Sequence, residues 1–182
     1  SAISADIQAQ SASPINSNIF DLIEKYGLKI KKNLVLDNEC QSVQVQERRG
    51  IFMMNRAMRY PFFPNVRNFN KSEIIVADLE QVVPFYPSEI VLDTMEVDLV
   101  AGTTDLFRSS NKSGSMENNF ILSPDPQQNP FINLLNQSGK ILAASSKLVN
   151  GGELILISDT KFLSDEAGMS VPDNMIFLLN AA

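Results

Sequence analysis

The sequence predicts an α/β fold, with helices flanking a sheet and an irregular, β-rich middle. The continuous apolar run Leu154–Ile157 is typical of a central strand that is buried on both faces of a sheet. Apolar residues at helical spacing occur near both ends of the chain, where the helices would flank that strand.

The first helix is expected just after residue 15. Asn16 or Ser17 can cap its start, and Gly27 can end it in a left-handed conformation. Its apolar stripe consists of Ile19, Phe20, Leu22, Ile23 and Tyr26. Residues 1–14, rich in Ser and Ala, are interpreted as an irregular lead-in, and residues 15–182 as a single α/β domain.

The middle of the chain favours short strands. Leu34–Leu36 is apolar, and Val43 and Val45 alternate with polar residues, which is the pattern of a half-buried strand. A turn is expected near Glu47–Gly50, followed by another strand. Tyr60–Pro64 cannot lie inside a helix because its prolines lack the N–H group and favour extended geometry. Residues 82–86 are also expected to be extended.

The second half of the chain is expected to form a loop, a hairpin and a last helix. Residues 108–119 are polar and are interpreted as a mobile surface loop, and residues 131–135 as a short helical turn. Asn150–Gly152 is a turn signal between strands at 141–147 and 153–158. Asp173 can cap the last helix, whose inward residues would be Met175, Ile176, Leu178 and Leu179.

Composition excludes several classes of protein. The 182 residues contain no His and one Cys, so the chain itself has no Ser–His–Asp or Cys–His catalytic unit, no disulfide and no Cys-cluster zinc site. No apolar run approaches the ~18–20 residues that span a bilayer, and no signal peptide opens the chain. The abrupt start and end suggest a fragment of a longer protein, itself soluble.

The net charge of −6 is unevenly distributed. Residues 1–72 hold ten basic and six acidic residues, whereas residues 73–182 hold five basic and fifteen acidic residues. The acidic part repels phosphate backbones, which argues against nucleic acid as a partner. The basic part is suited to an acidic membrane or a protein partner, or is an ordinary solvated surface.

Four segments, in order, resemble the GldG-like auxiliary components of ABC-type transport systems, a family associated with gliding motility. They are Asn18–Leu36, Arg59–Phe69, Val82–Ile90 and Leu154–Asn180. The resemblance implies a Rossmann-like, amidotransferase-like sheet in the extracytoplasmic (periplasmic) part of a protein of the cell membrane. It also implies an ABC permease and ATPase as partners, membrane anchoring only through segments absent from this chain, no catalytic residues and no cofactor.

Two clusters are candidate sites. Asp159, Thr160 and Asp165 follow the apolar strand, where α/β sheets bind ligands, and suit a cation or sugar hydroxyls; alternatively they form a turn and a solvated surface. The second cluster combines aromatic and basic residues, which are enriched at protein interfaces; alternatively its rings fill the core. Its members are Arg59, Tyr60, Phe62, Phe63 and Arg67.

The leading hypothesis is therefore a non-catalytic domain of an ABC-transporter auxiliary subunit that acts through contacts with the permease. The alternative is a glycan- or peptide-binding module that uses the acidic cluster. A hydrolase with Cys40 as its nucleophile is disfavoured, because no His is present to activate the thiol.

Overall fold

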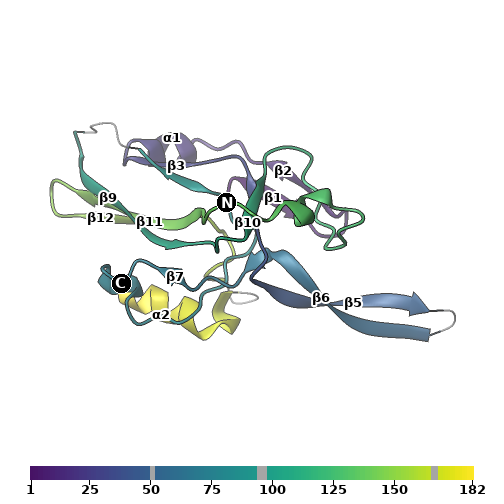
Figure 1. Ribbon diagram of the computed structural model, residues 1–182. Coiled ribbons are helices and arrows are strands. Elements are labelled where there is room, and N and C mark those ends of the chain that lie inside the picture. Colours follow the sequence, from purple (N-terminus) through teal and green to yellow (C-terminus); the bar gives the residue numbers. More distant parts are fainter. Residues whose placement is uncertain (50–51, 94–97, 165–167) are drawn as a thin grey trace.

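Antiparallel strands form most of the computed structural model, which describes residues 1–49, 52–93, 98–164 and 168–182 (Figure 1). Strands account for 41% of the structure and helices for 15%. Throughout the described part the strands pair antiparallel, in five separate sheets. The predicted Rossmann-like α/β fold is therefore wrong, because such a fold needs parallel strands joined by crossover helices.

The largest sheet has four strands in the order β12-β11-β9-β7. Their bounds are Glu153–Ile157, Ile141–Leu148, Val100–Arg108 and Asn68–Phe69. β11 and β12 form the predicted hairpin, whose turn contains Gly151 at φ +88°. The run Leu154–Ile157 is a strand, but it lies at the sheet edge and is half-buried rather than central. Both of its faces pack against apolar clusters, which explains why the run is continuously apolar.

One face of this sheet is covered by the C-terminal helix α2 (Pro172–Ala181) and the 3-10 helix η1 (Ile74–Val76). Phe177 of α2 packs edge-on against Phe107 of β9, with ring centroids 5.9 Å apart. The predicted helix is confirmed, but its predicted inward face is wrong: Asn174 and Phe177 are buried. Of the residues expected inside, Met175 is half-buried and the others are exposed, namely Ile176, Leu178 and Leu179.

Asp173 does not cap α2 either. Its carboxylate instead accepts hydrogen bonds from the backbone N–H groups of Glu80 and Gln81, at 2.7 and 2.8 Å. The short 3-10 helix η3 (Gly168–Ser170) precedes α2 in the chain. The side chain of Asp173, in the first turn of α2, therefore links the helix to residues 80–81 and does not cap it.

The other face is covered by the predicted first helix, α1 (Ile19–Glu24), and by the strand pair β3 (Leu28–Ile30) and β8 (Ile90–Leu92). Ile23 and Leu28 pack there against Ala144 of β11. Gly27 has φ +72°, as expected after the helix. The predicted side-chain cap is absent, although the N–H of Ile19 donates to Ser17 Oγ at 3.4 Å.

A second apolar core lies beside the sheet, and two polar segments contribute strands to it. The expected irregular lead-in is a hairpin of β1 (Ile3–Asp6) and β2 (Ser11–Pro14), with Ile3 buried. The expected loop at 108–119 contains β10 (Ser113–Met116), which pairs with β4 (Leu34–Asp37). Both predictions were wrong because single apolar residues, Ile3 and Met116, fix these segments in the core. The predicted helical turn is confirmed as η2 (Pro130–Leu134).

β5 (Cys40–Arg49) and β6 (Phe52–Pro64) form a long antiparallel pair, which we call the arm. It extends away from the rest of the molecule, and residues 50–51 at its far end lie outside the described part (Figure 1). Val43 and Val45 are half-buried and alternate with exposed Ser42, Gln44 and Gln46, as predicted. β5 continues to Arg49, so Glu47–Arg49 belong to a strand and not to the expected turn, and Gly50 lies outside the described residues.

Candidate functional site

The aromatic residues of the second candidate cluster lie at the base of the arm, where β6 joins the body. Tyr60 is 7% exposed, Phe62 is fully buried and Phe63 is half-buried. The Tyr60 ring lies 5.0 Å from that of Phe62 and 4.7 Å from that of Phe63, both in edge orientations. The rings therefore fill the core, as the alternative interpretation held, and of the three only Phe63 keeps appreciable accessible surface.

Tyr86 fixes this base from the opposite side. Its N–H donates to the carbonyl oxygen of Phe62 at 3.0 Å, and its phenol oxygen lies 3.1 Å from that of Tyr60. Its φ of +53° is a costly conformation for a bulky residue, so residues 82–86 are not uniformly extended as predicted. Burial raises the pKa of both phenols, so both are neutral, and the contact between the two buried rings is structural.

A groove of about 550 Å³ opens beside the base of the arm. One wall is formed by the arm itself, including Met58, Arg59 and Pro61, and the other by residues 124–127 and the end of η2. Its lining combines apolar and polar groups. The apolar lining includes Met58, Pro61, Pro124, Pro126, Ile132 and Leu135, and the polar lining includes Cys40, Arg59, Asp125 and Gln127.

The far wall of the groove is held in place by Asn129, which is fully buried. Its amide donates to the carbonyl oxygens of Ile121 and Ser123 at 2.8 and 3.2 Å, and its Oδ1 accepts from the N–H of Phe131 at 3.2 Å. The wall is therefore fixed by hydrogen bonds before any partner binds, which lowers the entropic cost of binding.

Cys40 lies in this groove without the features of a nucleophile. Burial raises the pKa of its thiol, and the opposing effect of Arg59, through charge and a hydrogen bond, is smaller. A reactive thiol requires the opposite shift. The geometry therefore agrees with the free, partly buried cysteine expected from the sequence.

Arg67 is separated from the groove. Its guanidinium donates two hydrogen bonds to Oε1 of Gln81, from Nε at 3.0 Å and from an Nη at 2.7 Å, and it lines a different, smaller hollow. Arg59 is exposed on the arm, whereas Arg67 follows the arm in sequence. The five residues of the second cluster thus divide into buried rings, an exposed Arg59 by the groove and a distant Arg67.

The acidic cluster does not assemble into a site in the described residues. One carboxylate oxygen of Asp159 accepts a hydrogen bond from the N–H of Phe85, and the other accepts one from the N–H of Lys161, both at 2.7 Å. Burial raises its pKa to about 6, against the smaller opposing effects of these bonds. Thr160 is exposed, and Asp165 lies outside the described residues. Asp159 therefore connects the end of β12 to the 82–86 segment, as the turn interpretation held.

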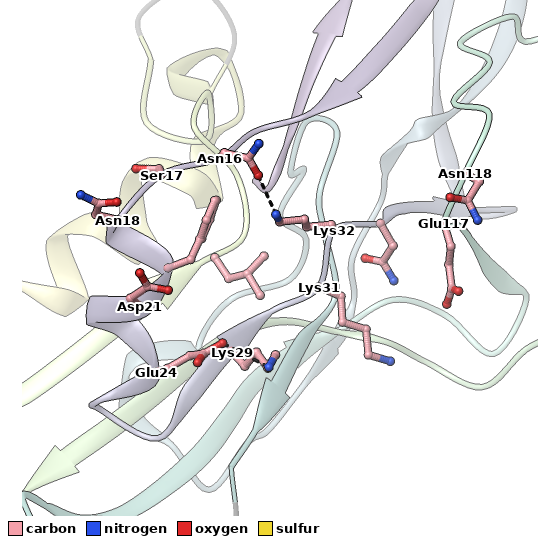
Figure 2. Close-up of a pocket in the computed structure, with 13 residues that line it drawn as sticks. Asn16, Ser17, Asn18, Asp21, Glu24, Lys29, Lys31, Lys32, Glu117 and Asn118 are labelled. Carbon is pink, nitrogen blue, oxygen red and sulfur yellow. Dashed lines mark hydrogen bonds and ion pairs between the residues drawn. The ribbon is translucent and has the colours of Figure 1, made fainter.

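A larger pocket, of about 830 Å³, was missed by sequence reasoning (Figure 2). It lies between α1, β3 and residues 117–118, with half-buried Phe20 and Ile30 among its lining residues. Charged and amide groups surround these two, and Lys32 Nζ donates to Asn16 Oδ1 at 2.7 Å. The signal in the sequence was the run Asn16–Asn18, which was considered only as a helix cap.

No group of three or more His, Cys, Asp or Glu side chains that could hold a metal ion occurs among the described residues. Among the helices of the described part, none is long and apolar enough to cross a membrane.

The fold and the groove define a β-rich domain with surfaces suited to binding. Residues 2–181 match the auxiliary family described as an ABC-type uncharacterized transport system, and the chain belongs to this family. No curated protein and no solved structure matches the chain. Membership suggests a non-enzymatic auxiliary role in an ABC transport system, association with transporter components and with a membrane.

Proposed function

We propose that this domain serves an ABC transport system as a non-catalytic auxiliary domain that contacts the permease, and that the groove at the base of the arm is the contact site. The observation that carries the proposal is the preformed groove. Its apolar groups, Met58 and Ile132 among them, suit buried side chains of a partner, and Arg59 offers hydrogen bonds at the edge. Family membership supports the transport setting.

The aromatic cluster supports this proposal indirectly. Tyr60 and Phe62 are buried beneath the groove wall, and their contacts with Tyr86 hold the arm base in one position. A partner would therefore meet a rigid wall that presents Arg59. Of the residues first expected to form the partner surface, Arg59 alone lines the groove and remains the proposed contact.

The test is co-purification of the full-length protein from membranes in mild detergent. Met58→Glu and Arg59→Glu should reduce recovery of the permease and ATPase at least about tenfold, as expected for loss of interface anchors. Lys25→Glu, a charge reversal at an exposed position at the end of α1 that does not line the groove, should not change it. Equal recovery with all variants would contradict the groove as the contact site. Absence of transporter components from the wild-type preparation would contradict the proposed function itself.

The GldG-like assignment, the link to gliding motility and the extracytoplasmic position are finer parts of the same proposal. They rest on the four-segment resemblance. Protease treatment of intact spheroplasts tests the position directly. Cleavage of this domain without lysis supports an extracytoplasmic location, and protection until lysis contradicts it.

A second candidate function is a ligand-binding module, which the pocket in Figure 2 favours. A half-buried Phe20 with amide and carboxylate groups around it is suited to a sugar or a short peptide. A ligand at 100 times its dissociation constant adds about 2.7 kcal/mol of stability. Thermal shift measurements with oligosaccharides and peptides should then show a rise in Tm that Phe20→Ala abolishes; no shift with any of them argues against this candidate.

A further inference from the structure

The end of the arm carries an unusual set of exposed apolar residues. Phe52, Met53 and Met54 are 68%, 62% and 53% exposed, and they are consecutive in β6. Successive side chains of a strand point to opposite faces, so Phe52 and Met54 share one face and Met53 lies on the other. Apolar side chains therefore cover both faces of the arm end, which we call the tip.

Apolar groups on two opposite faces of the tip help to distinguish a protein partner from a membrane. A rigid protein surface covers one face of a two-stranded ribbon and leaves the other in water. A lipid interface surrounds an inserted segment and can bury both faces together. The arrangement of Phe52 and Met53 therefore favours a membrane over a protein as the partner of the tip.

The charges along the arm indicate that this membrane contains anionic lipids. The arm, residues 40–64, contains four Arg and one acidic residue, Glu47, which stands opposite Met54. In the strand register Arg49 stands opposite Phe52 and Arg48 opposite Met53, with Arg56 and Arg59 further towards the body. Basic residues next to an apolar tip are complementary to anionic headgroups, which attract Arg near the surface.

The length of the arm makes this contact compatible with the acidic remainder of the chain. Residues 73–182 carry five basic and fifteen acidic residues, and would be repelled by an anionic surface. The register from Ser42 opposite Arg59 to Arg49 opposite Phe52 spans about 23 Å of strand. That distance exceeds the Debye length of about 8 Å at physiological salt by more than twofold, so the repulsion is largely screened.

We infer that the tip inserts into the interface of a membrane that contains anionic lipids, and so positions the domain against the bilayer in which the transport system works. This surface differs from the groove, and the two proposals can fail independently.

The chain contains no Trp, which gives a direct test. Phe52→Trp introduces a single reporter at the tip, and Ile74→Trp introduces a matched one at another exposed apolar position, 85% exposed, on the body. Vesicles of phosphatidylcholine mixed with phosphatidylglycerol should shift the emission of the first variant to the blue and leave the second unchanged. Vesicles of phosphatidylcholine alone should bind at least about tenfold more weakly, and high salt should release the protein.

Flotation of the otherwise native chain with the same vesicles supplies the second readout. Replacing Phe52, Met53 and Met54 together by Ser should reduce binding at least about tenfold, and so should Arg48→Gln combined with Arg49→Gln. Ile74→Ser should not change it. Circular dichroism checks that each variant is folded. Absence of an emission shift at the tip, or equal flotation of the Ser variant, overturns the inference. So does a result in which the Ser variant loses a protein partner while the native chain binds no vesicles.

Discussion

Asn174 is expected to be one of the most costly polar residues to remove from this domain. It is fully buried in the first turn of α2. Its amide donates to the carbonyl oxygens of Val83 and Phe162 at 3.1 and 3.3 Å, and its Oδ1 accepts from the N–H of Val83 at 3.0 Å. Together with Asp173 it attaches the helix to the segment that leads to Tyr86. Asn174→Ala is the perturbation that tests this role.

The magnitude follows from the groups left behind. Alanine removes all three bonds and leaves the N–H of Val83 and two carbonyl oxygens buried without these partners. Each unsatisfied buried group costs about 1–3 kcal/mol, with carbonyls at the lower end because they have a second lone pair. The expected loss is therefore about 3–5 kcal/mol, which corresponds to a fall in Tm of about 6–20 °C for a domain of this size.

Urea unfolding followed by circular dichroism measures this loss. Asn118→Ala, at an exposed position, is the matched control and should change the free energy of unfolding by less than about 0.5 kcal/mol. A loss below about 1 kcal/mol for Asn174→Ala would refute the reasoning. It would mean that water or a rearranged backbone satisfies the groups around Val83.

Three further predictions concern other buried groups. Ser146 has a buried hydroxyl with no hydrogen-bond partner among the described residues, so Ser146→Ala should raise the free energy of unfolding by up to about 1 kcal/mol in the same urea assay. The pKa of Asp159 is raised to about 6, so the folded chain keeps a proton that the unfolded chain releases above about pH 4. The free energy of unfolding should therefore fall by on the order of 2 kcal/mol as the pH rises from about 4 to about 6. Asp159→Asn should flatten that fall. Because burial raises the pKa of Cys40, iodoacetamide should alkylate it more slowly at neutral pH than free cysteine, and faster reaction would contradict the geometry.

Sequence patterns were sufficient to predict the elements that depend on residues close together in the chain. The helix before Gly27, the turn at Asn150–Gly152 and the alternation around Val43 were all predicted, because each depends on neighbours in sequence. The fold class was wrong because the run Leu154–Ile157 was interpreted as a central parallel strand. An edge strand with both faces against apolar clusters produces the same apolar run, and periodicity alone does not distinguish the two.

Elements fixed by distant contacts could not be predicted. β10 is a strand because Met116 is buried beside Leu34 and Leu36, far away in sequence, while its own residues favour a loop. The inward face of α2 was missed for a related reason. Asn174 is polar and was not among the residues expected to face inward, and backbone groups of Val83 and Phe162, supplied by other segments, make its burial favourable.

The candidate site shows the same division between local and distant causes. The rings of Tyr60 and Phe62 were recognised in the sequence, but their burial depends on Tyr86, whose left-handed backbone no local pattern indicated. Because that conformation is costly, the contacts of Tyr86 with the arm base must outweigh it. The groove wall and the tip are then two parts of one strand pair: the base is fixed by buried rings, and the strands place Phe52 about 23 Å away from it. A short loop with the same residues would lack that separation.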